Sequence, residues 1–167
     1  LGAEVRVIIT SGGREFVSEL SLQTVSKNKV HDNLWDKEAE LAMGHIELAK
    51  WADAVIIAPA SANTISRLCH GKADDLLSTV ILATNASVLI APSMNQQMFA
   101  SKAIKENLKI LNNRGVVTID PGFGEQACGD IGEGRLAEPE EIAKQVANIF
   151  SNSTLSGKKV LITIGGT

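Results

Sequence analysis

Two stretches of this sequence place polar side chains directly after short apolar runs. The first extends from Ala91 to Met98 (APSMNQQM). Pro92 lacks the N–H that a strand ladder requires, so the preceding strand is predicted to end there. The side chain of Asn95 offers a carbonyl acceptor and an NH₂ donor, which suits it to orient an amide or a carboxylate. A structural interpretation is also open, in which Asn95 caps the next helix while Met94 and Met98 fill the core.

The second stretch, Pro59 to Thr64 (PASANT), follows the apolar run 54–58 in the same way. In open α/β sheets, ligands bind at the carboxyl ends of parallel strands. Small hydroxyl and amide residues that open a helix there, such as Ser61 and Asn63, form a site for an anion or a polar ring. Helix capping by Ser61 or Asn63 is the alternative, and both roles are compatible.

One histidine and one cysteine are further candidates. His45 follows Gly44 at a junction between segments, where it is either a proton carrier or a plain surface residue. Cys128 lies in segment 120–135, which is rich in glycine and shows no hydrophobic period, so it is predicted as a long loop without secondary structure. A glycine-rich loop can deliver a thiol to a substrate. A surface cysteine without a role is the alternative.

The elements that must position these residues alternate between apolar strands and amphipathic helices. Strands are predicted at 4–10, 54–58, 87–90, 116–119 and 160–164. Helices are predicted at 14–20, 38–43, 65–70, 76–83, 101–114 and 140–150, and the region 22–36 is predicted as irregular. This alternation is typical of a three-layer α/β domain with a mostly parallel sheet.

Composition and charge exclude several functional classes. The 167 residues fit one domain with a sizeable core. The net charge of −3 gives no general affinity for nucleic acid or for a membrane surface, and no apolar run reaches transmembrane length. No spacing of metal ligands is present, so no metal site is predicted. Two cysteines do not make a disulfide framework, which indicates a reducing, cytoplasmic setting.

Four segments, in this order, resemble the flavin-dependent phosphopantothenoylcysteine decarboxylases, a group of homo-oligomeric flavin-containing Cys decarboxylases. They are Gly44–Leu48 (GHIEL), Ala58–Thr64 (APASANT), Pro92–Met98 (PSMNQQM) and Ala127–Arg135 (ACGDIGEGR). The tail Gly157–Thr167 (GKKVLITIGGT) is similar to the opening strand of the phosphopantothenate–cysteine ligase domain, which many bacteria fuse to the decarboxylase. The resemblance implies a flavoprotein domain at 1–150, a linker at 151–158, and the first strand of a truncated ligase domain at 159–167.

The resemblance also implies a three-layer α/β/α, Rossmann-like (flavodoxin-like) fold. Family members begin with a strand, a glycine-rich turn and a helix that precede the position of Leu1. The first strand of a doubly wound sheet is central, so its absence predicts a gap in the core. We interpret the chain as a fragment of a longer gene product, with the fused ligase domain continuing beyond residue 167.

The cofactor implied by the resemblance is FMN, and the substrate is 4′-phosphopantothenoylcysteine of coenzyme A biosynthesis. Oxidation of the thiol to a thioaldehyde permits loss of CO₂, and reduction of the ene-thiol then gives 4′-phosphopantetheine. By resemblance, His45 is the base or proton carrier and Cys128 protonates the ene-thiolate carbon. Asn95 binds the substrate carboxylate or amide, and Met98 and Ala127 lie beside it. The residues implied to line FMN are Thr10, Ser11, Phe16, Ser61, Ala62, Asn63, Thr64 and Ser93.

The family assembles as trimers or dodecamers with flavin sites at subunit contacts, so a homo-oligomer is expected, with His45 supplied by a neighbouring subunit. Three other interpretations stay open. A lantibiotic-type peptidyl-cysteine decarboxylase shares the flavin site, a flavin prenyltransferase has no need of Cys128, and a binding subunit on the same fold needs no catalytic group. The joint presence of His45, Asn95 and Cys128 favours a decarboxylase.

Overall fold

The computed structural model describes residues 2–35, 44–127, 129–150 and 155–164. Its main sheet has six strands in the order β2-β1-β8-β3-β4-β5, and all neighbouring pairs are parallel. The strands are β1 (Glu4–Ile9), β2 (Val30–His31), β3 (Ala54–Ala60), β4 (Ser87–Pro92), β5 (Val117–Thr118) and β8 (Lys159–Ile164). The predicted mostly parallel sheet is confirmed.

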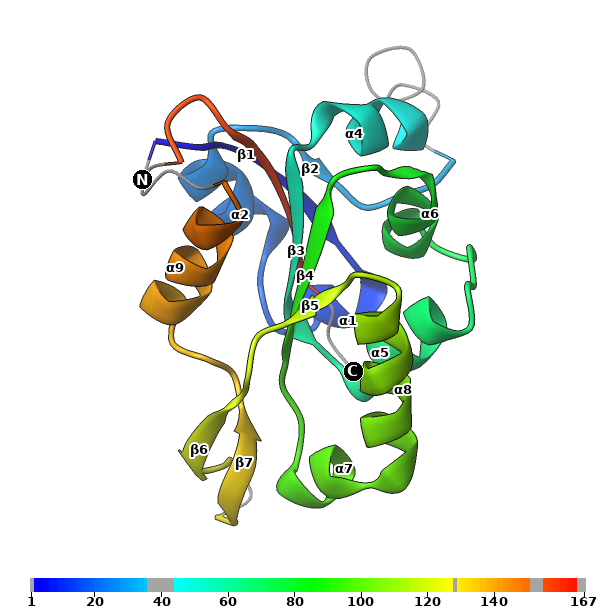
Figure 1. Cartoon of the computed structure of the whole chain (residues 1–167). Helices are drawn as coiled ribbons and strands as arrows, with labels where there is room; N and C mark the ends of the chain where they lie inside the picture. The colour runs from blue at the N-terminus through cyan, green and yellow to red at the C-terminus, as the bar shows by residue number, and fades with distance from the viewer. Residues whose placement is uncertain (1, 36–43, 128, 151–154, 165–167) are drawn as a thin grey trace.

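Helices cover both faces of this sheet (Figure 1). One face packs against α4 (His45–Trp51), α5 (Ala62–Cys69), α6 (Leu76–Ala83) and α8 (Lys102–Asn113). The other face packs against α2 (Glu19–Ser26) and α9 (Pro139–Ile149). Two short helices, α1 (Ser11–Arg14) and α7 (Gln96–Ala100), follow β1 and β4. The predicted three-layer architecture is therefore confirmed.

The strands β3 and β4 are apolar along their length because helices cover both sides of them. Val55 and Ile57 point into the core under α5 and α8, whereas Ala54 and Ile56 pack on the side of α9. Burial of each large aliphatic side chain contributes about 1.5–3 kcal/mol. A continuous apolar run is what a strand covered on both faces requires. The pairing ends with Ala60 beside Pro92, which brings the loops after both strands to the same edge.

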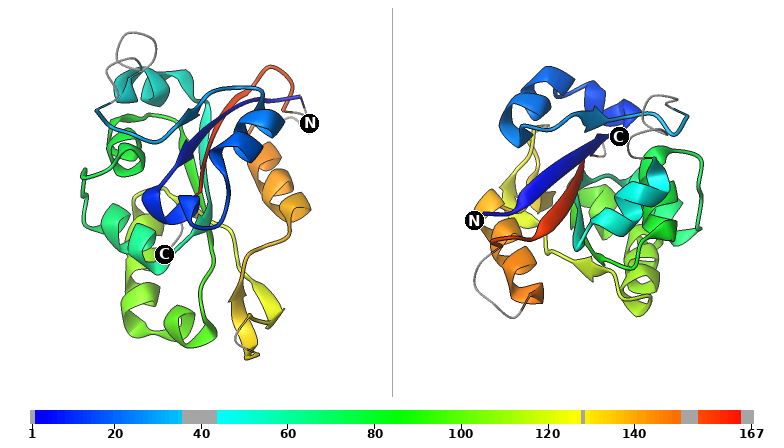
Figure 2. Two further views of the ribbon diagram at one scale, coloured as in Figure 1. Left: turned by 180° about the vertical axis from the view of Figure 1, so that it is seen from behind. Right: turned by 90° about the horizontal axis from the view of Figure 1, so that it is seen from above.

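The strand β8 lies in the centre of the sheet, between β1 and β3 (Figure 2). Its register with β1 runs from Glu4↔Lys159 to Ile9↔Ile164. Val160 and Leu161 are buried on opposite faces of the sheet, so β8 contributes to both halves of the core. The predicted gap in the core is therefore wrong, because this apolar strand fills the central position. The assignment of 159–167 to a separate ligase domain stays a prediction.

The end of β8 is held by the turn that follows β1. The backbone N–H and the hydroxyl of Thr10 both donate to the carbonyl oxygen of Ile164, at 3.1 and 2.9 Å. A Cβ at Gly13 would lie 2.5 Å from the same carbonyl oxygen. Gly13 is therefore needed for the close approach of the two backbones, rather than for a special turn conformation.

Three local predictions are wrong. The helix predicted at 14–20 is replaced by α1 and by α2, which starts at Glu19 because the Ser18 hydroxyl accepts from the N–H of Ser21 at 3.1 Å. The region 22–36, predicted as irregular, contains most of α2 and all of β2. The segment 120–135 forms an antiparallel hairpin of β6 (Gly122–Glu125) and β7 (Ile131–Arg135).

The hairpin could not be predicted because the buried positions of β7 are glycines, which give no hydrophobic period. The helix predicted at 38–43 lies outside the described residues. Within the described ranges, no helix is both long and apolar enough to cross a membrane.

We expect Thr163→Val to stabilise the protein. The Thr163 side chain is fully buried in β8, and its hydroxyl has no hydrogen-bond partner among the residues that the structure describes. Replacing this hydroxyl by a methyl group of similar shape removes a desolvation cost of ~1 kcal/mol. For a chain of this size, thermal unfolding should then show a Tm that is higher by about 2–4 °C.

Thr84→Val is the matched control. The hydroxyl of Thr84 donates to the carbonyl oxygen of Ala49 at 2.7 Å, so its removal should lower Tm. If both variants lower Tm to a similar degree, the hydroxyl of Thr163 is hydrogen-bonded in solution and the expectation for β8 fails.

Candidate active site

Polar loops gather at the edge of the sheet where β1, β3 and β4 end. Residues 10–13 follow β1, 61–64 follow β3 and 93–95 follow β4. The β6–β7 hairpin lies at the same end of the molecule, next to α7 (Figure 1). This is the edge at which open α/β sheets bind ligands.

Asn95 has a defined side-chain orientation in this region. Its Oδ1 accepts from the N–H of Gln97 at 2.8 Å, so Asn95 caps α7 as the structural interpretation predicted. Its Nδ2 donates to Oδ2 of Asp130 at 3.2 Å, across to the hairpin. The amide donor of Asn95 therefore already binds a carboxylate, which is the kind of group that the resemblance assigns to it.

The hairpin packs directly against the loop that carries Asn95. The N–H of Met94 donates to the carbonyl oxygen of Gly134 at 2.9 Å. A Cβ at Gly134 would lie 2.3 Å from the carbonyl oxygen of Met94, and a Cβ at Gly132 would lie 2.0 Å from Oε1 of Gln96. Because real side chains cannot make such contacts, both positions require glycine for the two segments to meet.

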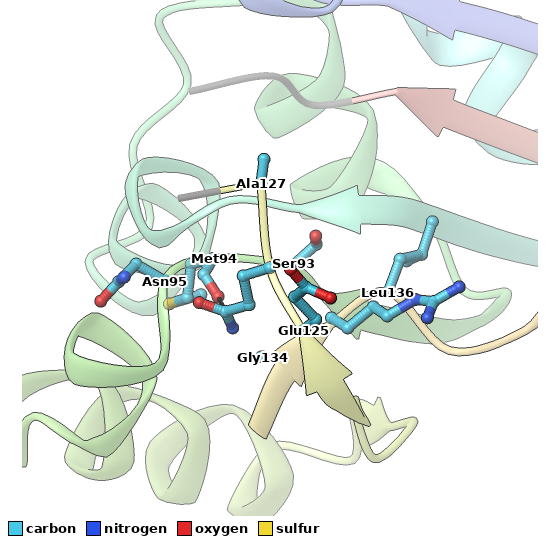
Figure 3. Close-up of a pocket in the computed structure, with 9 residues that line it drawn as sticks. Ser93, Met94, Asn95, Glu125, Ala127, Gly134 and Leu136 are labelled. Carbon is cyan, nitrogen blue, oxygen red and sulfur yellow. Dashed lines mark hydrogen bonds between the residues drawn. The ribbon is translucent and has the colours of Figure 1, made fainter. Parts of the chain in front are cut away.

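A pocket of about 530 Å³ opens between this loop and the hairpin (Figure 3). It brings together three residues that the sequence predicted: Ser93, Asn95 and Ala127. The full lining is Ser93, Met94, Asn95, Glu125, Gln126, Ala127, Gly134, Arg135 and Leu136. Sequence reasoning missed Glu125 and Gln126 as site residues, because the loop prediction for 120–135 gave no reason to single out either side chain.

A second, smaller cavity of about 60 Å³ joins the loops after β1 and β3. Four of its lining residues, Thr10, Ser11, Asn63 and Thr64, were predicted to line a cofactor, and Gly12, Arg67 and Asp75 complete it. Arg67 forms ion pairs with Asp75 and, at 3.4 Å, with Asp74. Hydroxyls and a guanidinium can bind a small anionic group such as a phosphate, but in this structure the carboxylates of Asp74 and Asp75 neutralise the guanidinium.

The capping role predicted for Ser61 is confirmed, whereas Asn63 is not the cap of α5. Ser61 is 2% exposed, and its Oγ accepts from the N–H of Thr64 at 3.2 Å at the start of α5. Asp75 caps α6 in a reciprocal capping box with Ser78. Ala62 is half-buried in the first turn of α5. These residues shape the edge of the sheet whether or not they contact a ligand.

Other predicted site residues do not reach the pocket in this chain. Phe16 is 73% exposed, and Met98 is 44% exposed, so Met98 does not fill the core. His45 begins α4, which lies at the opposite end of the sheet from α7 and the hairpin (Figure 1). Cys128 lies outside the described residues. No cluster of three or more metal-binding side chains occurs in the part of the chain that the structure describes.

Comparisons with family models and with known proteins agree on the family of this chain. A family model described as Flavoprotein matches residues 1–151. The coenzyme A biosynthesis bifunctional protein CoaBC of Haemophilus influenzae is 55% identical over 166 residues, and that of Escherichia coli is 48% identical over 167 residues. Each match covers 99% of this chain but only 42% and 41% of the relative. The chain thus spans less than half the length of these curated relatives.

Solved structures share the fold. A mutant PPC decarboxylase complexed with pantothenoylaminoethenethiol superposes with a TM-score of 0.70 at 26% identity, covering 91% of this chain and 100% of that one. The FMN-dependent cysteine decarboxylase TvaF from thioviridamide biosynthesis gives a TM-score of 0.61 at 32% identity, covering 71% and 72% of the two chains. The FMN-binding protein AtHal3 gives 0.65 at 27% identity, covering 90% and 98%.

We expect Gly134→Ala to detach the hairpin from the loop that carries Asn95. Gly134 has φ +131°, and the added Cβ would collide with the carbonyl oxygen of Met94. The hydrogen bond from the N–H of Met94 to Gly134 should then break. Hydrogen exchange at the Met94 amide should become faster by about tenfold or more, which corresponds to the loss of one ordinary hydrogen bond.

Gly71→Ala provides the control for backbone strain. Gly71 also has a left-handed conformation (φ +64°), but a Cβ added there would meet no atom of the described residues within 4 Å. In that variant the strain has no effect on the hairpin, so exchange at Met94 should stay at the wild-type rate while overall stability falls by ~1 kcal/mol. Equal acceleration of hydrogen exchange at Met94 in both variants would contradict the proposed contact between the hairpin and the Asn95 loop.

Proposed function

Because the chain belongs to the flavoprotein family, we propose that it catalyses the FMN-dependent decarboxylation of 4′-phosphopantothenoylcysteine in coenzyme A biosynthesis. The observation that carries this proposal is the contact between the Asn95 loop and the hairpin, because it brings Asn95 to the same pocket as Ala127, the sequence neighbour of Cys128. The identity to CoaBC proteins over 99% of the chain supports the same reaction.

The residues present fit an FMN group. The cavity beside Thr10, Ser11 and Arg67 is our candidate for the phosphate, which would replace the carboxylate of Asp75 as the partner of the Arg67 guanidinium. Ser61, Ala62, Asn63 and Thr64 follow β3, and Ser93 follows the neighbouring β4, so the polar groups of both loops face one edge of the sheet. When bound, FMN supplies a two-electron oxidation of the substrate thiol and returns the electrons after CO₂ has left.

The chain's own residues bind the substrate and move protons. Asn95 is oriented to donate to the carboxylate or the amide of the cysteine unit, as its bond to Asp130 illustrates. We assign Ala127 to the wall beside it. Contact of Met98 with the substrate stays a prediction, since Met98 does not line this pocket. We assign Cys128 as the acid that delivers a proton to the ene-thiolate carbon, since a free thiol with a pKa of about 8.5 is largely protonated at neutral pH.

We assign His45 as the base or proton carrier, and its position favours an oligomer. Its helix α4 lies at the far end of the sheet from the Asn95 loop, so His45 must act in the site of another copy (Figure 1). Three large apolar side chains are more than two-thirds exposed on the surface, namely Phe16, Leu20 and Trp35. We assign Phe16 to a flavin site that a contact between subunits completes. We therefore propose a trimer or a dodecamer in the cytoplasm, fused to a ligase domain.

A second candidate acts on a cysteine at the end of a peptide. The similar structure TvaF is an FMN-dependent cysteine decarboxylase, and it is 32% identical to this chain. The geometry of the pocket between the Asn95 loop and the hairpin does not by itself distinguish the two substrates, so an assay must separate them. CO₂ release from 4′-phosphopantothenoylcysteine, and none from a peptide that ends in cysteine, supports the first proposal.

We expect Cys128→Ser to separate CO₂ release from product formation. Oxidation and decarboxylation precede the step that needs the acid, so CO₂ should still be released, with 4′-phosphopantetheine reduced at least about 100-fold. The ene-thiol should then accumulate, once per flavin without air and repeatedly in air, where O₂ reoxidises the flavin. A related PPC decarboxylase mutant has been observed in complex with pantothenoylaminoethenethiol, which is a compound of this class.

His45→Asn is the companion variant, and it should block CO₂ release itself. Both variants should retain the visible spectrum of bound flavin, which checks that the site is intact. Normal rates of CO₂ release and product formation in Cys128→Ser would leave the cysteine without a catalytic role. A wild-type protein that carries no flavin and decarboxylates neither substrate would refute the proposed function.

A further inference from the structure

Gln126 connects the hairpin to the loop that carries Asn95. It follows the last residue of β6, and its side-chain Oε1 accepts from the N–H of Gln96 at 3.0 Å. Its Nε2 donates to the carbonyl oxygen of Met94 at 3.3 Å and to that of Glu133 at 3.4 Å. One side-chain amide thus binds both the site loop and the opposite strand of the hairpin.

The backbone of Gln126 closes the turn at the tip of the same hairpin. Its N–H donates to the carbonyl oxygen of Asp130, and its carbonyl oxygen accepts from the N–H of Gly129, both at 2.8 Å. Asp130 in turn accepts from Nδ2 of Asn95. The turn is therefore attached to the site loop at both of its ends, through Gln126 and through Asp130.

The groups that Gln126 satisfies have no obvious substitute. The N–H of Gln96 belongs to the first turn of α7, where backbone donors lack partners within the helix. The side chain of Gln126 is only partly exposed, so water can replace it only in part. A Cβ at Gly134 would lie 3.0 Å from Nε2 of Gln126, which shows how closely the amide fits against β7.

We infer that Gln126 is a positioning residue that holds the hairpin turn against the Asn95 loop for delivery of the last proton. This inference rests on the proposed function, because the proton donor assigned there belongs to the same turn in the sequence. Gln126 itself transfers no proton, and it acts by keeping the turn on the Met94–Gln96 backbone.

A merely structural role for Gln126 makes a different prediction. Loss of general stability lowers the amount of active protein, so CO₂ release and 4′-phosphopantetheine formation fall together and their ratio is unchanged. Loss of positioning slows the last step more than it slows the earlier oxidation and decarboxylation. The ratio of product to CO₂ therefore distinguishes the two roles.

The test uses Gln126→Leu in the flavin-loaded protein, with Gln145→Leu as the matched control. Gln145 is also partly buried and hydrogen-bonded, to Glu141 on α9, but it lines neither the pocket beside Asn95 nor the small polar cavity. In Gln126→Leu, assayed in air so that O₂ reoxidises the flavin, we expect the product-to-CO₂ ratio to fall by about tenfold, as for the loss of one or two hydrogen bonds. CO₂ release itself should fall less than product formation, because Gln126 also lines the pocket. Gln145→Leu should keep the wild-type ratio.

Hydrogen exchange gives a readout that does not depend on activity. In Gln126→Leu, the amides of Met94 and Gln96 should exchange about tenfold faster, while those of β3 keep their protection. An unchanged ratio, a parallel fall of both products, or unchanged exchange at Met94 and Gln96 would each overturn the inference. A wild-type protein without decarboxylase activity would refute the proposed function instead, whatever the exchange data show.

Discussion

The parallel pairing of β3 with β4 is the constraint on which the rest of the site depends. Both strands are largely buried on two faces, so their register is set by apolar side chains that cannot be moved to solvent. The pairing runs from Ala54↔Ser87 to Ala60↔Pro92. Since parallel strands end at the same edge, the polar loops that follow them meet without any direct attraction between the loops themselves.

The hairpin adds the second wall of the pocket by a different means. Its contact with the Asn95 loop combines a backbone–backbone hydrogen bond with hydrogen bonds that involve the side chains of Asn95 and Gln126, and it depends on the missing side chains of Gly132 and Gly134. Few apolar groups are buried there, so the contact relies on hydrogen bonds from Met94, Asn95 and Gln126. Such a contact opens at less cost than a packed core, which suits an element that must admit a substrate.

Strand β8 and His45 each link parts of the protein that lie far apart in the sequence or in space. β8 supplies core to both faces of the sheet and receives two hydrogen bonds from Thr10, a residue that also lines the small polar cavity. Occupation of the centre of the sheet is thereby coupled to the shape of this cavity. His45, on α4, lies far from the pocket of its own chain, so the role proposed for it requires a second copy.

The sequence by itself determined the class of fold, the polar loops after β3 and β4, and the caps at Ser61 and Asn95. These features are local, because apolar runs and capping residues act over a few neighbours. Tertiary structure alone decided that 120–135 forms a hairpin, that β8 occupies the centre, and that Gln126 faces Met94. Glycines leave no hydrophobic pattern, and a contact between residues 32 positions apart depends on packing that no local pattern encodes.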